Sequence, residues 1–237
     1  MGNNGKKLTK PATRDEVDAF LRKVAATPAV KPAGRRGRLI FAMDATASRE
    51  PTWDRACHIQ GQMFETTASL GGLKIQLCYY RGYGEFKASP WLTGSKELLK
   101  RMTGVFCLGG LTQIEKVLQH ALKETRHKKV DAVVFVGDVM EEDVDRLTHL
   151  AGELGLLGVP VFLFQEGVEP VAERVFRQIA RLTNGAFCPF DSSSADQLRD
   201  LLSAVAVYAA GGRRALEDFG KSRGGMVLRL VHQVKKD

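Results

Sequence analysis

The feature that most constrains the fold of this 237-residue chain is the alternation of short apolar runs with helical patterns. The apolar runs predict strands at 38–44, 73–80, 131–138, 158–165 and 186–190. The RGYG turn at 81–84 predicts a hairpin that adds a short strand near 85–87. The intervening patterns predict helices at 52–70, 95–103, 112–126, 141–156 and 171–182, and a last helix within 192–210.

This order of elements predicts one fold class. Strands that alternate with helices form a parallel sheet with helices on both faces, because each crossover to a parallel neighbour is right-handed. The hairpin adds one antiparallel edge strand, which is common in such sheets. We therefore predict an α/β domain over 38–210, with a doubly wound, mostly parallel sheet. Alternating apolar residues at 226–231 predict a further edge strand.

The net charge of +8 is unevenly distributed along the chain. Residues 1–38 carry ten Lys and Arg against three Asp and Glu, and 211–237 carry seven against three, whereas 39–210 have a net charge of −3. We interpret 1–37 as a basic arm with a Pro/Gly linker and 211–237 as a basic extension. The arm contains an amphipathic helix at 14–26, whose apolar face we expect to pack on the core.

Several protein classes are disfavoured by the sequence. It has no run of about 18 apolar residues, so we expect no membrane span. The first ten residues, MGNNGKKLTK, lack the apolar segment of a secretory signal. The four cysteines are far apart, without the C-x-x-C spacing of zinc or redox sites. We expect a soluble, cytoplasmic protein.

Polar side chains stand where predicted strands end. Asp44, Thr46 and Ser48 occupy alternate positions after the first strand, and Asp138 closes the most apolar strand. Thr112 opens a helix in the loop between them. Ligands of such sheets bind beyond the carboxyl ends of the strands. Two carboxylates and three hydroxyls, all oxygen donors, suit a hard cation such as Mg²⁺, with Mn²⁺ or Ca²⁺ as alternatives.

The same residues give residues 38–210 a resemblance to the von Willebrand factor A family. The metal-ion-dependent adhesion site of that family has D-x-S-x-S on the first strand-end loop, a Thr on a later loop, and an Asp that closes a subsequent apolar strand. This chain has D-A-T-A-S at 44–48, then Thr112 and Asp138, in the same order.

The resemblance implies roles for these residues. The hydroxyls of Thr46, Ser48 and Thr112 would contact the metal, with Asp44 and Asp138 held close to it or acting through water. A vacant coordination position would accept a carboxylate from a partner protein.

The chain departs from the family pattern at two places. Thr46 replaces the first Ser of the pattern, which retains the donor oxygen. The third loop reads GDVMEE at 137–142, where the family commonly has T-D-G after its strand. The glycine after Asp138 is therefore missing, and Glu141 and Glu142 bring additional negative charge to the loop.

Some of these residues also have purely structural interpretations. Thr112 could cap its helix, with Glu115 completing a capping box. Glu141–Asp145 are expected to begin a helix, where acidic residues favour the positive end of the dipole. Arg49 is expected in solvent, where it could steer an acidic ligand. The aromatic residues within 79–86 are expected to pack on the sheet and its edge.

The sequence favours a non-catalytic, Mg²⁺-dependent interaction module, an adaptor that binds an acidic residue of a partner protein. The resemblance implies a subunit of a larger assembly as partner, including assemblies with ring-forming ATPases. One rival is a phosphatase-like or phosphotransfer enzyme with Asp44 as nucleophile, although Thr46 stands where many such enzymes have a second Asp. Another rival is nucleic-acid binding through the basic tails, which the slightly acidic core does not favour.

Overall fold

The computed structural model describes residues 13–26, 36–49, 72–190, 200, 202–211 and 215. Four of the predictions concern segments outside the described residues. These are the first part of the basic arm at 1–12, the linker, the helix at 52–70 and the edge strand at 226–231.

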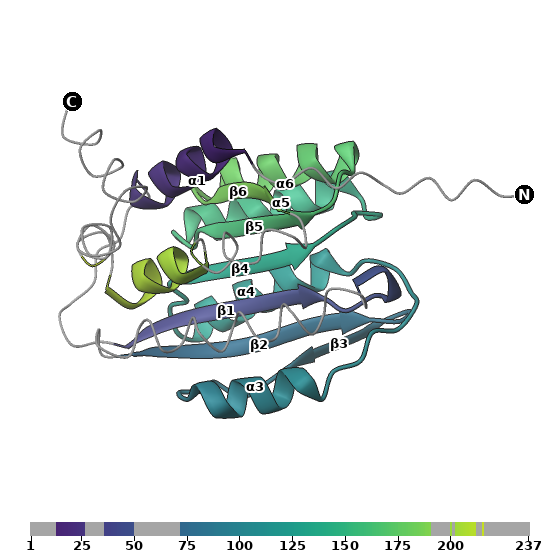
Figure 1. Ribbon diagram of the computed structural model, residues 1–237, viewed down its shortest axis with the longest axis horizontal. Coiled ribbons are helices and arrows are strands. Elements are labelled where there is room, and N and C mark those ends of the chain that lie inside the picture. The colour runs from purple at the N-terminus through teal and green to yellow at the C-terminus, as the bar shows by residue number, and fades with distance from the viewer. Residues whose placement is uncertain are drawn as a thin grey trace, which may run out of the picture.

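Six strands form one sheet in the order β3-β2-β1-β4-β5-β6 (Figure 1). All neighbouring pairs are parallel except β2 and β3, which form the predicted antiparallel hairpin. The α/β class and the mixed sheet are therefore confirmed. The strands are β1 (Gly37–Asp44), β2 (Leu73–Arg81), β3 (Glu85–Ala88), β4 (Ala132–Gly137), β5 (Val161–Glu166) and β6 (Ala186–Phe190).

Helices cover both faces of the sheet (Figure 1). On one face, α1, α3 and the helical residues 202–211 share a core with alternate residues of the central strands. On the other face, α4, α5 and α6 bury the remaining strand residues. The helices named are α1 (Arg14–Ala26), α3 (Ser95–Thr103), α4 (Ile114–His127), α5 (Val144–Leu156) and α6 (Pro170–Leu182). No described helix is long and apolar enough to cross a membrane.

Helix α1 packs on the sheet, as its apolar face predicts. The ring of Phe20 lies 6.1 Å from the ring of Phe162 and 5.1 Å from that of Phe164. The helix begins with a reciprocal capping box, in which the Thr13 N–H donates to Glu16 at 2.8 Å and the Glu16 N–H donates to the Thr13 hydroxyl at 3.3 Å. The arm is therefore anchored to the core through this helix.

The register of the central strands brings the candidate residues to one edge of the sheet. Met43 lies opposite Val136, so Asp44 at the end of β1 lies beside Gly137 at the end of β4. A Cβ atom at Gly137 would stand only 2.8 Å from the ring of Phe135, which explains the absence of a side chain there. Asp138 follows β4 directly and begins the loop.

Two helices start later than predicted, and the first of them, α4, begins at Ile114 rather than at 112. Helix α5 begins at Val144 rather than at 141, and its N-cap is Asp143, whose carboxylate accepts the Arg146 N–H at 2.9 Å. Glu141 and Glu142 therefore do not belong to the first turn of α5. They remain in the loop, where Glu141 contacts Thr112 and Glu142 contacts the first turn of α4.

Candidate metal site

Asp44 is the most buried charged residue of the candidate set, with no exposed side-chain surface. Its Oδ1 accepts the Thr46 N–H at 2.7 Å, and its Oδ2 accepts the Tyr80 hydroxyl at 3.0 Å. Tyr80 was expected only to pack, but it holds Asp44 in place. The pairing of β1 with β2 sets Asp44 directly opposite Tyr80. The contact between the two side chains could therefore be predicted only from the register of these strands.

Burial changes the ionisation of this pair. Burial and, to a smaller extent, the negative charge of Asp138 raise the pKa of Asp44, the hydrogen bonds from Thr46 lower it, and the net result is a pKa of about 6. Burial and the charge of Asp44 also raise the pKa of Tyr80, so the phenol remains a hydrogen-bond donor. A nearby cation would therefore stabilise the ionised form of Asp44.

The two hydroxyls of the first loop lie together. The side-chain oxygens of Thr46 and Ser48 are 3.1 Å apart, and a short 3₁₀ turn over Ala47–Arg49 holds the second of them. Thr46 is buried, whereas Ser48 is exposed. The loop thus offers one inner and one outer hydroxyl above the end of β1.

The loop before α4 is fastened to the same edge of the sheet. The Leu108 N–H donates to the carbonyl of Ala45 at 3.0 Å. Gly110 lies against the backbone of Gly82, where a Cβ atom would come within 2.0 Å of a carbonyl oxygen. Only glycine allows the two backbones to lie this close. Two residues further on, Thr112 lies against the third loop.

Thr112 binds the third loop rather than capping its own helix. Its Oγ1 accepts the Glu141 N–H at 3.0 Å, and its own N–H donates to the Glu141 carboxylate at 3.2 Å. The N-cap of α4 is Gln113, which makes no side-chain cap bond. The capping-box interpretation of Thr112 and Glu115 is therefore wrong.

Glu142 supplies the missing cap from a distant part of the chain. Its two carboxylate oxygens accept the N–H groups of Ile114 and Glu115 at 2.6 and 2.8 Å. These contacts explain why Glu141 and Glu142 stay outside α5, since both are engaged at the start of α4. The third loop is thereby fixed to the loop that carries Thr112.

Asp138 completes the set and leaves one polar atom unsatisfied. Its Oδ1 is buried and has no hydrogen-bond partner among the described residues. Asp138 is close enough to Asp44 for its charge to raise the pKa of that carboxyl. A buried carboxylate oxygen without a donor is costly, and a cation is the species that it fits best.

Arg49 is buried, contrary to the expectation that it lies in solvent. Its side chain is 1% exposed and forms an ion pair with Glu166 at the end of β5. Burial lowers the pKa of Arg49, while the charges of Asp138 and Asp44 raise it. The 3₁₀ turn at its position directs the guanidinium inward, so the protein itself supplies one positive charge beside three acids.

The donor set suits a hard cation held mainly by hydroxyls and two carboxylates. Among the described residues, no cluster of three or more His, Cys, Asp or Glu side chains is positioned to hold a metal ion. Oxygen donors and the unsatisfied Asp138 oxygen fit Mg²⁺ or a similar ion.

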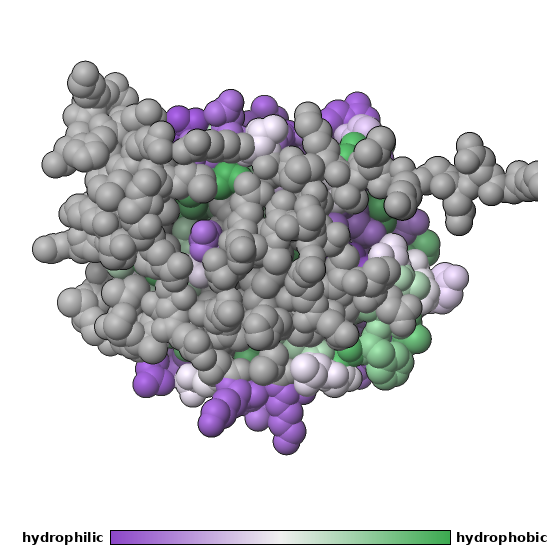
Figure 2. Space-filling view, in the orientation of Figure 1, coloured by the Kyte–Doolittle hydropathy of each residue, from purple (hydrophilic) through white to green (hydrophobic). Residues whose placement is uncertain are grey.

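Large apolar side chains are exposed around this site. Among the described residues, nine large hydrophobic side chains are exposed, and six of them lie in loops or helix starts at the carboxyl ends of the strands; we call these six the apolar rim. Figure 2 shows hydrophobic side chains gathered at the right of the molecule, where β1 and β2 end in Figure 1. The apolar rim consists of Tyr83, Phe106, Leu108, Leu111, Val168 and Val171.

Comparisons with known proteins give structural matches only. No family model and no curated protein sequence matches the chain. A von Willebrand factor type A structure from Catenulispora acidiphila matches with a TM-score of 0.58 at 15% identity, over 72% of this chain and 43% of that one. The fold is that of a von Willebrand factor A domain. Sequence identity at this level establishes the fold and no more.

Two further structures with the von Willebrand factor A fold match this chain. The SpRpn10 VWA domain has a TM-score of 0.56 at 12% identity, over 76% of this chain and 98% of that one. Proximal thread matrix protein 1 from the mussel byssus, in a form with a zinc-occupied MIDAS motif, has a TM-score of 0.60 at 13% identity, over 75% and 47%. The chain thus spans less than half of two of these three proteins.

Proposed function

We propose that the protein is a divalent-cation-dependent interaction module, in which a partner protein supplies a carboxylate to the bound ion. The proposal rests above all on the buried Oδ1 of Asp138, which has no hydrogen-bond partner among the described residues. A zinc-occupied MIDAS motif in a mussel protein of the same fold supports a divalent ion. The proposed ligands of Mg²⁺, or of Mn²⁺ or Ca²⁺, are Asp44, Thr46, Ser48, Thr112 and Asp138.

The residues of the chain would act by holding oxygen donors in fixed positions. Tyr80 and the Thr46 N–H orient Asp44, and Glu141 orients Thr112 through two hydrogen bonds. A bound divalent ion supplies the positive charge that attracts a carboxylate from outside. Because Ser48 is exposed, a partner side chain can approach the site from its side.

The apolar rim supports a protein as the partner. Exposed apolar patches beside a polar site are typical of interaction surfaces. We infer a partner with an acidic side chain flanked by apolar ones, which would be a subunit of a larger or ATPase-containing assembly. We also propose a cytoplasmic setting, because the buried cysteines Cys78 and Cys188 are free thiols.

The geometry favours this proposal over an enzyme with Asp44 as nucleophile. Asp44 has no exposed surface, and both of its carboxylate oxygens accept hydrogen bonds. A nucleophile must reach its substrate, and this carboxylate faces the interior. If D44N abolished a metal-dependent phosphatase activity of the purified protein, the enzyme would replace the interaction module.

Partner capture with and without metal tests the proposed function. The tagged full-length protein would be crosslinked in cell extract in Mg²⁺ or in EDTA, for wild type, Thr112→Ala and Thr112→Ser. We expect a partner retained in Mg²⁺ by the wild type and Thr112→Ser, and lost with EDTA or Thr112→Ala. Equal capture in EDTA would contradict the proposed function.

A further inference from the structure

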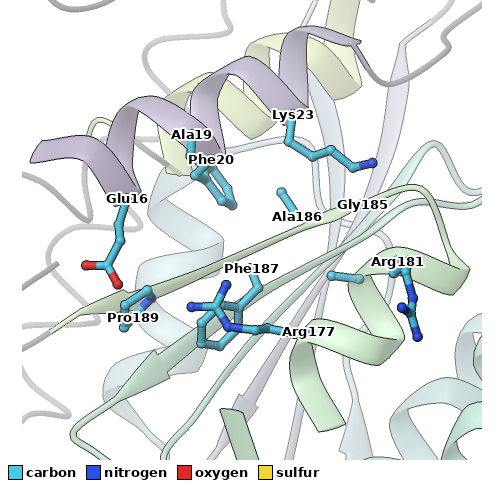
Figure 3. A pocket seen from close by; sticks show the side chains of 11 residues that line it. Glu16, Ala19, Phe20, Lys23, Arg177, Arg181, Gly185, Ala186, Phe187 and Pro189 are labelled. Atoms are coloured by element: carbon cyan, nitrogen blue, oxygen red, sulfur yellow. The ribbon is translucent and has the colours of Figure 1, made fainter. Parts of the chain in front are cut away.

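A groove lies at the opposite edge of the sheet from the β2–β3 hairpin, beside β6. Strand β6 is the last in the sheet order and pairs with β5. Helices α1 and α6 lie on opposite faces of the sheet, and both line a hollow of about 280 Å³ (Figure 3). A hollow lined from both faces lies across the edge of the sheet, where β6 forms its floor.

The floor of the groove is apolar. Phe20 of α1, Ala186 and Phe187 contribute to it. Phe187 is half-buried, and the guanidinium of Arg177 lies 4.4 Å from the centre of its ring. Arg177 also pairs with Glu173 at 2.8 Å. The groove can therefore bury an apolar side chain of a ligand next to the guanidinium of Arg177.

The walls of the groove are mainly positive. They contain Lys23, Arg177 and Arg181 against one acid, Glu16 (Figure 3). The carboxylate of Glu16 is occupied by the Thr13 N–H and hydroxyl at 2.8 and 3.0 Å. Arg181 is exposed and forms no ion pair with any other residue that the structure describes. The groove therefore favours a negatively charged occupant.

The backbone of β6 offers a second recognition element. One side of an edge strand carries N–H and C=O groups that can pair with an added strand. Pro189 has no N–H, and Ala186 and Cys188 are buried, so Phe187 is the residue of β6 whose backbone an added segment can reach. A short extended segment fits this edge better than a long strand.

We propose that the groove beside β6 binds an acidic, extended segment of a partner protein, which pairs with the backbone of β6 at Phe187. The tails of this chain are poor occupants by charge, since residues 1–12 and 221–237 are both basic. The groove is distinct from the Asp44 site and needs no metal. It would let one domain hold two segments at once.

Fluorescence polarisation of a labelled octapeptide tests the groove. The full-length protein would be titrated into Glu-Val-Glu-Thr-Glu-Val-Glu-Thr at low salt, in EDTA, with the Lys-substituted counterpart as the reversed-charge peptide. We expect saturable binding of the acidic peptide, and a loss of about tenfold or more in affinity for Lys23→Glu/Arg181→Glu. The matched double variant Arg22→Glu/Arg174→Glu changes exposed cations of α1 and α6 that do not line the groove, and should retain wild-type affinity.

Amide hydrogen exchange separates strand addition from charge attraction. Bound peptide should slow exchange at Phe187, because a new backbone hydrogen bond forms there. The proposal is wrong if the peptide does not bind, if both double variants lose affinity equally, or if exchange in β6 is unchanged. Binding in EDTA keeps the result independent of the proposed metal site.

Discussion

Asp44 is a carboxyl group without exposed surface, and its ionisation in the metal-free protein is therefore costly. Its pKa is raised from 3.8 to about 6, mainly by burial. Between these values the folded state binds a proton more tightly than the unfolded state does. The free energy of unfolding must therefore decrease as pH rises through this window.

The pH dependence of stability tests this ionisation. In EDTA, the free energy of unfolding should fall by about 2 kcal/mol between pH 4 and pH 7 because of Asp44, since each unit of pKa shift contributes about 1.4 kcal/mol over the complete titration. Urea unfolding of the wild type and of Asp44→Asn would measure it, since the variant lacks this titration. Parallel profiles for the two proteins would show that Asp44 ionises normally.

Arg49 is the resident cation of the site, and its removal should have two effects. Arg49→Met leaves Glu166, Asp44 and Asp138 without that charge, which should cost about 3–5 kcal/mol of stability in EDTA. The same change removes a competitor of the metal, so the affinity for Mg²⁺ should rise.

Chemical unfolding with and without Mg²⁺ measures both effects of Arg49→Met. Arg146→Met is the matched control, because that arginine is 67% exposed in its ion pair. Weaker Mg²⁺ binding by Arg49→Met would mean that Arg49 supports the site instead of opposing the metal.

At the scale of elements, apolar runs and helical spacing were sufficient to predict most of the order and the strand ends. The strand at 186–190 and the helix at 95–103 have the predicted bounds. Such patterns report burial on one face, which is a local property of the sequence. The start of α5 was wrong because Glu141 and Glu142 find partners 27 to 29 residues away.

Long-range contacts likewise explain what the sequence missed in the site. The hydrogen bond from Tyr80 to Asp44 depends on strand register, and the burial of Arg49 depends on Glu166 from another strand. Neither partner is near in sequence. The candidate oxygen donors could be found because they follow apolar runs, whereas the groups that orient and neutralise them could not.

Because Glu142 caps α4 from the loop before α5, we predict that this one side chain contributes measurably to the stability of α4. Glu142→Ala should lower the free energy of unfolding by about 1–2 kcal/mol, because two N–H groups of the first turn lose their acceptor. Faster amide exchange at Ile114 and Glu115 would locate the effect. Glu97→Ala on α3 is the control for an exposed ion pair, and an equal loss there would contradict a specific cap.

On the scale of the whole molecule, the polar site and the apolar rim lie at the carboxyl ends of the strands, and the groove lies beside β6. Under the two proposals, the carboxyl ends of the strands would bind a metal-held acid and the edge at β6 would bind an extended segment.

The apolar rim should contribute to partner binding and not to folding. Phe106→Ser with Leu111→Ser should change stability by less than about 0.5 kcal/mol, since these side chains are 61% and 53% exposed. Metal-dependent capture of the partner should nevertheless be lost. Leu156→Ser, at a residue 91% exposed in α5, is the matched control, and equal capture by all variants would exclude the rim from the interface.

The most direct measurement for the metal site is calorimetric titration of Mg²⁺ and Mn²⁺ into the wild type, Asp138→Asn and Asp145→Asn. Asp145 is an exposed carboxylate of the first turn of α5, so its variant controls for the loss of one negative charge. We predict saturable binding by the wild type and Asp145→Asn, and a loss of binding in Asp138→Asn. Undiminished binding by Asp138→Asn, or no binding by the wild type, would contradict a metal held at these three loops.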